Sequence, residues 1–152
     1  MTLYNHFASK DDLILAVLKY REQQVSEMFD RSIRRHVKKG LSRLEAFFAA
    51  LKDWFKSRNF RGCSFINAAV ELADTSHPAS QFSSAHKERF HKMIREILAE
   101  SEGPKAADLA PAVSLIVEGA IVTAVLERSP DAADVAKNAA MALIPQKTRK
   151  KK

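Results

Sequence analysis

Residues 2–13, with the sequence TLYNHFASKDDL, have the pattern of a short helix, a tight break and the capped start of a long helix. Ser9 is a favourable N-cap residue, and the Asp12 carboxylate three residues later can accept hydrogen bonds from free N–H groups of the first turn. Before the cap, Leu3 and Phe7 are four residues apart and share a helical face. The stretch therefore predicts two helices that meet near Ser9, the first with a buried apolar face.

Polar side chains surround that apolar face and could contact nucleic acid. They are Thr2, Tyr4, Asn5, His6 and Lys10. Donors of these types bind DNA phosphates, and a short helix with a buried face fits the back of a helix-turn-helix recognition unit. We therefore predict a DNA-binding segment in this part of the chain.

The same string resembles a known family. Residues 2–7, followed by Ser9-Lys10 and Leu13, are similar to the recognition-helix signature of TetR-type bacterial transcriptional regulators. The resemblance implies an all-α fold and a homodimer that represses transcription by binding operator DNA, which it releases when a small apolar or aromatic effector binds. It also implies that Thr2, Tyr4, His6 and Lys10 contact phosphates, with Asn5 beside them.

In that family, two complete helices and the front of the recognition helix precede this signature, which takes about 40 residues. We therefore interpret residues 1–12 as the C-terminal remnant of a helix-turn-helix and expect a fragment or a misplaced start codon. Operator DNA is a partner if the missing helices are present. The alternative, if Met1 is the true start, is a helical dimerisation and ligand-binding module without DNA binding.

The composition favours one globular domain built from long helices. The chain has 152 residues, 46% of them hydrophobic, with only four glycines and five prolines. No uninterrupted apolar run reaches the about 18 residues of a membrane span, so we predict no membrane partner. The lone Cys63 excludes an internal disulfide and favours the cytoplasm. We assign residues 13–146 to a helical ligand-binding and dimerisation domain.

The formal net charge of +7 is unevenly spread. Residues 147–152 hold five of the 25 basic residues, which leaves 20 basic against 18 acidic residues elsewhere. We predict that this segment is a solvated, disordered tail, with weak phosphate binding as the alternative. A second basic cluster, Arg31 to Lys39, is interpreted as a solvated helix face rather than a phosphate site.

Apolar spacing predicts the first four helices. A stripe at Ile14, Leu18, Val25, Phe29 and Ile33 indicates a helix from Ser9 to about Lys39, ended by Gly40. The next helix starts near Ser42, where Ser42 and Glu45 match a capping box. A short helix over residues 63–74 and a long one over residues 79–102 follow, the latter stopped by Gly103-Pro104.

The last two predicted helices indicate dimerisation. Residues 108–127 are apolar on nearly all sides, and a second helix, capped by Ser129 with Pro130 in its first turn, is rich in alanine. One core of this size cannot cover both, so we predict a homodimer through a four-helix bundle. A monomer with a very apolar core is the alternative. The expected interface residues are Val113, Val117, Ile121, Val125, Ala136, Ala140 and Leu143.

The sequence contains no catalytic, cofactor or metal motif. The five histidines have no i,i+4 pairing, and no glycine-rich phosphate loop or CxxC pair is present. We therefore predict that the protein is not an enzyme, needs no cofactor and binds no metal.

A small-molecule cavity is better supported, because most aromatic residues lie in the middle of the chain. The predicted ligand-binding residues are Phe48, Leu51, Trp54, Phe55, Phe65, Asn67, Val70, Glu71, His86, Phe90 and Glu118. Ordinary core packing is the alternative for the aromatic residues and for His86. Glu118 could instead bond across a dimer or reach water. Cys63 is expected to be a small buried residue rather than a thiol sensor.

Overall fold

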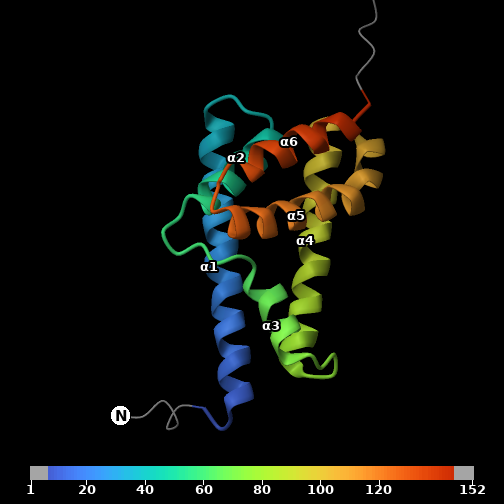
Figure 1. Cartoon of the computed structure of the whole chain (residues 1–152). Coiled ribbons are helices and arrows are strands. Elements are labelled where there is room, and N and C mark those ends of the chain that lie inside the picture. The colour runs from blue at the N-terminus through green and yellow to red at the C-terminus, as the bar shows by residue number, and fades with distance from the viewer. Residues whose placement is uncertain (1–6, 146–152) are drawn as a thin grey trace, which may run out of the picture.

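The computed structural model describes residues 7–145, and all regular structure in that part of the chain is helical (Figure 1). The elements in order are α1 (Lys10–Lys38), α2 (Arg43–Phe55), α3 (Ser64–Leu72), α4 (Pro78–Glu102), the 3-10 helix η2 (Pro104–Leu109), α5 (Ala110–Glu127) and α6 (Ala132–Leu143). The all-α prediction is therefore confirmed.

Helices α1 and α4 are the two long rods of the molecule and run side by side in the same direction (Figure 1). The short helix α3 lies across their lower half, near their N-terminal ends. Helices α5 and α6 cross the upper half as an antiparallel pair, and α2 packs there against α1 and α6. The upper half therefore has several layers, whereas α1, α3 and α4 alone form the lower half.

Local capping signals set the ends of the first helices as the sequence predicts. The backbone N–H of Asp12 donates to Ser9 Oγ (3.1 Å), and Gly40 ends α1 with φ +93°. At the start of α2 the bonds are reciprocal: Glu45 N–H donates to Ser42 Oγ (3.2 Å), and Ser42 N–H donates to the Glu45 carboxylate (3.0 Å). The capping box is confirmed.

Replacing Ser42 with alanine should lower the free energy of unfolding by about 1 kcal/mol, because the first turn of α2 loses a bonded N–H partner. Urea unfolding of Ser42→Ala measures this. Ser57→Ala, at an exposed serine beyond the C-terminal end of α2, is the matched control and should change stability by less than about 0.5 kcal/mol. Equal stability of the two variants would contradict the role given to the cap.

Two predicted helix starts are wrong. Residues 104–109 form η2, so α5 begins at Ala110 rather than at Asp108. Helix α6 begins at Ala132 rather than at Pro130. The Ser129 hydroxyl does accept a bond from Asp131 N–H (3.2 Å), but it closes a turn through Pro130 instead of capping the helix.

The core lies where α2, α4 and α5 meet. Leu44, Phe47, Ile94, Ile97 and Val113 have no exposed surface. The Phe47 ring is central, with its centroid 5.9 Å from that of Phe29 on α1 and 6.4 Å from that of Phe90 on α4. Burial of this aromatic group joins three helices into one body.

Polar contacts attach α1 and α6 to α2. The Asp53 carboxylate on α2 accepts hydrogen bonds from Ser32 Oγ (2.7 Å) and Arg35 (2.5 Å), and His36 Nε2 lies 2.8 Å away. Burial raises the pKa of Asp53, but bonds from His36 and Ser32 outweigh it, so the net pKa is lowered and the carboxylate stays charged. On the other side, Lys52 pairs with Asp131 and Asp134 at the start of α6.

Helices α5 and α6 bury alanines together with some larger residues, and they expose several large apolar side chains. Five of the predicted interface residues, Val113, Val117, Ile121, Ala136 and Ala140, are buried inside the single chain and belong to its own core. A helix that is apolar all round does not reveal from its sequence which side faces inward. Val125 and Leu143 are exposed, together with Leu115, Val122, Leu126 and Val135.

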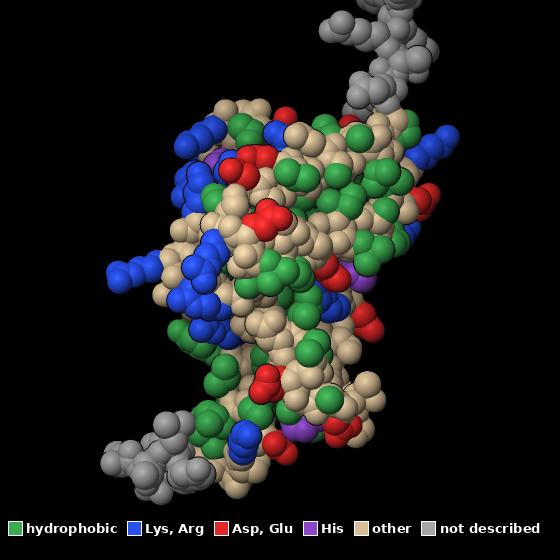
Figure 2. Space-filling view, viewed as in Figure 1, with side chains coloured by type: hydrophobic (Ala, Val, Ile, Leu, Met, Phe, Trp, Pro, Cys, Tyr) green, Lys and Arg blue, Asp and Glu red, His purple; other side chains and the backbone are tan. Residues whose placement is uncertain are grey.

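These exposed residues form what we call the α5/α6 apolar face. Green hydrophobic side chains gather over α5 and α6 on the side seen in Figure 2. On α5, Leu115, Val122 and Leu126 follow helical spacing, and the exposed Gly119 lies between them. Exposed apolar surface of this kind is typical of interaction sites.

Residues Pro104–Glu127, which include η2 and α5, are the one segment of residues 7–145 that is long and apolar enough to cross a membrane by length and composition. The sequence prediction concerned an uninterrupted apolar run, and Ser114 and Glu118 interrupt this segment. A core helix of a globular protein meets the same criteria, and α5 packs against both α4 and α6. We infer no membrane insertion from it.

Candidate functional site

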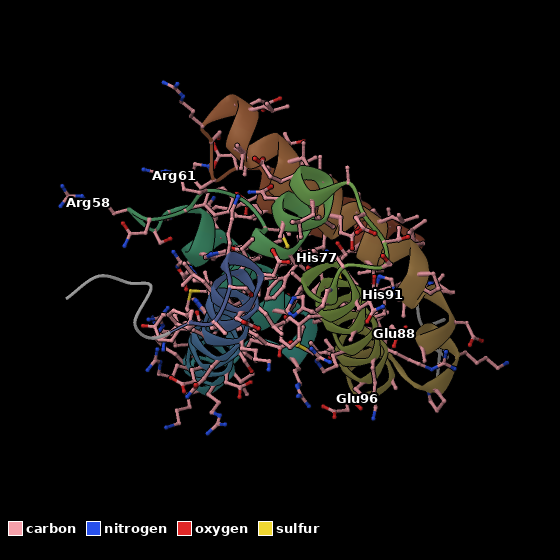
Figure 3. All side chains as sticks on the ribbon, turned by 90° about the horizontal axis from the view of Figure 1, so that it is seen from below. Arg58, Arg61, His77, Glu88, His91 and Glu96 are labelled. Atoms are coloured by element: carbon pink, nitrogen blue, oxygen red, sulfur yellow. The ribbon has the colours of Figure 1, made fainter. Side chains whose placement is uncertain are left out.

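A cavity of about 560 Å³ opens between α1 and α4 and extends to α2, the start of α3 and α5. Its size is in the range of small-molecule sites. Seen from below, α1 and α4 lie side by side, with many side chains between them (Figure 3). The lining residues come from five helices, so α1 to α5 must pack together to build this space.

The inner wall of the cavity is apolar and largely aromatic. It is formed by Val25, Phe29, Leu51, Trp54, Phe65, Phe90, Met93, Val117 and Ile121. Phe29 stands edge-on to Trp54, with ring centroids 5.8 Å apart, and both belong to the aromatic group that continues to Phe60. This wall can bury an apolar or aromatic body.

A polar cluster from α1 and α4 lies at the cavity and centres on Glu22. The Glu22 carboxylate accepts two hydrogen bonds from Arg89, at 3.1 Å from Nε and 2.5 Å from the terminal nitrogen, and His86 Nδ1 lies 2.9 Å away. The His86 ring stacks on Phe65, with centroids 3.5 Å apart and planes 15° apart. We call Glu22, His86 and Arg89 the Glu22 cluster.

Protonation in the Glu22 cluster follows from burial and pairing. Burial raises the pKa of Glu22, but the bonds from Arg89 and His86 outweigh it, so the net pKa lies below the ordinary value. Burial lowers the pKa of His86, and the Glu22 carboxylate opposes this only in part. At neutral pH Glu22 is therefore charged and His86 is neutral.

Acid should weaken the fold through His86. The folded pKa of His86 lies below that of the unfolded chain, so the stability due to its neutral form is fully present above about pH 6.5 and is lost as the pH falls through the folded value. In urea unfolding at pH 7.5 and pH 5.5, His86→Leu should lose less stability on acidification than the unsubstituted chain. Val70→Leu, at an exposed position of α3 with no titratable group, should lose as much as the unsubstituted chain. Equal losses in all three would contradict this role.

A second ion pair connects the cavity to α5. Lys87 Nζ lies 2.8 Å from the Glu118 carboxylate and 5.4 Å from the centroid of the Phe90 ring. Glu118, one of the predicted ligand-binding residues, thus pairs within its own chain and does not line the cavity. Lys87 does line it, so the pair forms part of the cavity's surroundings.

The structure brings five of the predicted ligand-binding residues together. Leu51, Trp54, Phe65, His86 and Phe90 all line the cavity. Phe48 and Phe55 are core residues instead, because their side of α2 faces the rest of the helical body. Asn67, Val70 and Glu71 are exposed on the far side of α3, where Asn67 donates to the Arg61 carbonyl (3.3 Å).

Sequence reasoning missed Glu22 and Arg89. A usable signal existed for Glu22, because the apolar stripe of α1 advances from Leu18 to Val25 and leaves out the intervening helical position, which is residue 22. A carboxylate on a buried stripe requires a partner. Arg89 carries no such signal, since it lies on a largely exposed position of α4.

The predicted DNA-binding residues are mostly beyond the part described. Thr2, Tyr4, Asn5 and His6 lie outside residues 7–145. Lys10 is exposed at the first position of α1. Near it, Asp11 lies 3.3 Å from Nε2 of His77, the residue that caps α4, so the N-terminal ends of α1 and α4 are adjacent. No group of three or more metal-binding side chains occurs within residues 7–145.

Comparison with known proteins gives the class and then the family. Residues 40–140 match the family model described as "Tetracyclin repressor-like, C-terminal domain". The chain is 25% identical over 134 residues to the HTH-type transcriptional regulator YjdC of Escherichia coli K12, covering 88% of this chain and 70% of YjdC, and YjdC of Shigella flexneri matches equally.

A solved structure agrees with these matches. SCO4454, a TetR-family transcriptional regulator from Streptomyces coelicolor, superposes with a TM-score of 0.78 at 26% identity, over 93% of this chain and 75% of its own. The chain therefore belongs to the TetR family of transcriptional regulators.

Proposed function

We propose that the protein is a ligand-responsive repressor that acts as a homodimer and releases operator DNA when a small apolar or aromatic effector occupies the cavity. The observation that carries this is the cavity itself, with its aromatic wall and a polar cluster supplied by α1 and α4. Regulators of this family generally dimerise and bind DNA. In this proposal residues 1–12 belong to the DNA-binding unit, and the cytoplasm is the place of action.

The α5/α6 apolar face supports the homodimer. Two copies related by a two-fold axis can cover Leu115, Val122 and Leu126 with the same residues of the partner, which forms a four-helix bundle. In the single chain these side chains are exposed to water. Burying them in a dimer removes apolar surface from water, which stabilises the dimer.

Helix α1 connects the cavity to the N-terminal segment that we assign to DNA binding. Glu22 and Asp11 lie on this one helix, about 16 Å apart along its axis. Both contact α4, through the Glu22 cluster and through His77. An effector that favours a different spacing of α1 and α4 at Glu22 therefore shifts the N-terminal end of α1 as well.

Binding of the 152-residue chain to DNA from the region upstream of its own gene tests the regulatory part. We expect salt-steep, sequence-selective binding by fluorescence anisotropy at two salt concentrations, weakened by the small molecule that co-purifies and is identified by mass spectrometry. Absence of DNA binding by a chain that still holds the ligand would favour the dimerisation and ligand-binding module instead.

A cavity-filling variant tests the link between the two activities. Met93→Trp places a larger side chain in the cavity, so this variant should bind DNA but no longer respond to the ligand. Val70→Trp, at an exposed position of α3, should respond as the unsubstituted chain does. An unchanged response in Met93→Trp would show that the effector acts elsewhere.

A further inference from the structure

His86 presents one free ring nitrogen at the cavity. Its Nδ1 is committed to Glu22 at 2.9 Å, and no residue among 7–145 bonds to its Nε2. Some side-chain nitrogens and oxygens of the described residues are fully enclosed by protein and have no hydrogen-bond partner. Nε2 of His86 is not one of them, so protein does not enclose it completely. Because the ring lines the cavity, Nε2 is accessible to a molecule bound there.

The Glu22 carboxylate determines which nitrogen carries the proton. A carboxylate only accepts hydrogen bonds, so His86 Nδ1 must be the N–H donor in this pair. Burial lowers the pKa of His86, so at neutral pH the ring holds that one proton. His86 Nε2 is therefore an unprotonated nitrogen with a lone pair, which is a hydrogen-bond acceptor.

The ring is also held in one orientation. Phe65 covers one face of it at a centroid distance of 3.5 Å, and Glu22 holds Nδ1. A flipped ring would move Nδ1 away from its carboxylate partner. The acceptor is therefore preorganised before a ligand arrives, which reduces the cost of binding.

The charged α4 side chains at the cavity are already paired. Arg89 bonds to Glu22, and Lys87 pairs with Glu118. A charged ligand group beside His86 would have to separate one of these pairs and leave a partly buried charge without its partner. Lys19 and Glu27 of α1 also line the cavity, but both are exposed to water, so a pair formed with them adds little to affinity. The open polar position beside the aromatic wall is thus the acceptor of His86.

We propose that the effector is an uncharged apolar or aromatic molecule with a hydroxyl group, such as a phenol or an alkanol, which donates a hydrogen bond to Nε2 of His86. The proposal rests on the effector role of the cavity put forward above and narrows its ligand class. The apolar body of such a molecule lies against Phe29, Trp54 and Phe90.

Three matched probes test the preference by isothermal titration calorimetry on the full chain at neutral pH: para-butylphenol, its methyl ether para-butylanisole, and para-butylbenzoate. The ether keeps the shape but cannot donate, and the benzoate is an anion. We expect the phenol to bind about tenfold more tightly than either of the others, because only the phenol satisfies the acceptor. Trp54 lines the cavity and is the only tryptophan of the chain, so its fluorescence reports whether the cavity is occupied. This fluorescence should change when the ether, which cannot donate a hydrogen bond, is added at a saturating concentration.

Two variants connect the preference to His86. In His86→Leu the phenol and the ether should bind within about twofold of one another, since the acceptor is gone. In His91→Leu, on the side of α4 away from α1 in Figure 3, the tenfold preference should remain. Each ratio is measured within one variant, so a general loss of affinity or stability cancels.

The outcomes separate the two proposals. Equal binding of phenol and ether by the unsubstituted chain, or a preference that survives in His86→Leu, overturns the hydroxyl proposal but keeps the cavity as an effector site. Tighter binding of the benzoate overturns it in favour of an anionic ligand. Failure of all three probes to bind or to change Trp54 fluorescence rejects the effector role of the cavity, and the hydroxyl proposal with it.

Discussion

A chain carrying Leu115→Glu and Leu126→Glu should be a monomer at micromolar concentrations at which we expect the unsubstituted chain to form the proposed dimer. Both side chains are more than 70% exposed in the single chain, so the substitutions cost the monomer little. In a two-fold dimer they would bury four carboxylates without partners, at several kcal/mol. Because every 1.4 kcal/mol is about a factor of ten, the dissociation constant should rise at least about a hundredfold.

Sedimentation equilibrium measures that change directly. The matched control carries Val17→Glu and Val37→Glu, two exposed apolar positions on α1. This control adds the same charge to a different surface and should remain dimeric. A dimer that persists in the α5 variant would place the subunit contact away from the α5/α6 apolar face.

Replacing Phe47 with alanine should lower the free energy of unfolding by about 3–5 kcal/mol, the cost of removing a buried aromatic side chain. Phe47 has no exposed surface, and its ring contacts those of Phe29, Phe48 and Phe90. Phe29 and Phe90 also line the cavity, so the substitution removes support from behind the aromatic wall. Ligand affinity should therefore fall together with stability.

Urea unfolding with a fixed slope gives the stability change. The exposed Val70→Ala is the control and should lie within about 0.5 kcal/mol of the unsubstituted chain. A loss below about 1 kcal/mol in Phe47→Ala would mean that the core is not organised around this ring.

Several helix ends were predictable because their signals are local. The caps at Ser9 and Ser42 and the stop at Gly103-Pro104 depend on hydrogen bonds and dihedral angles within a few residues, which the sequence displays directly. The start of α6 was missed because Ser129-Pro130 is an equally good beginning for a turn, and the ion pairs of Lys52 with Asp131 and Asp134 come from a distant helix.

The sequence predicted a cavity with aromatic walls, but it did not predict correctly which residues line it. A concentration of aromatic residues indicates an apolar interior, and five predicted residues do line the space. All three aromatic residues of α2 at positions 48, 54 and 55 were predicted to line the cavity, but only Trp54 lies on the side of α2 that does so. That choice depends on how α2 rotates against its neighbours, which is a property of the assembled core. The Glu22 cluster depends likewise on α1 and α4 lying together.

Helix α5 has a property that follows from its even apolarity. In most helices, the contrast between an apolar side and a polar side determines which side faces the core. In α5 the inward residues mix Val113, Val117 and Ile121 with Ser114, Ala120 and Ala124, while Leu115 and Leu126 point outward. The steric fit of this inward set against the neighbouring helices, rather than a contrast in hydrophobicity, therefore orients α5. A steric choice made inside one subunit thus decides which surface it can offer to a second.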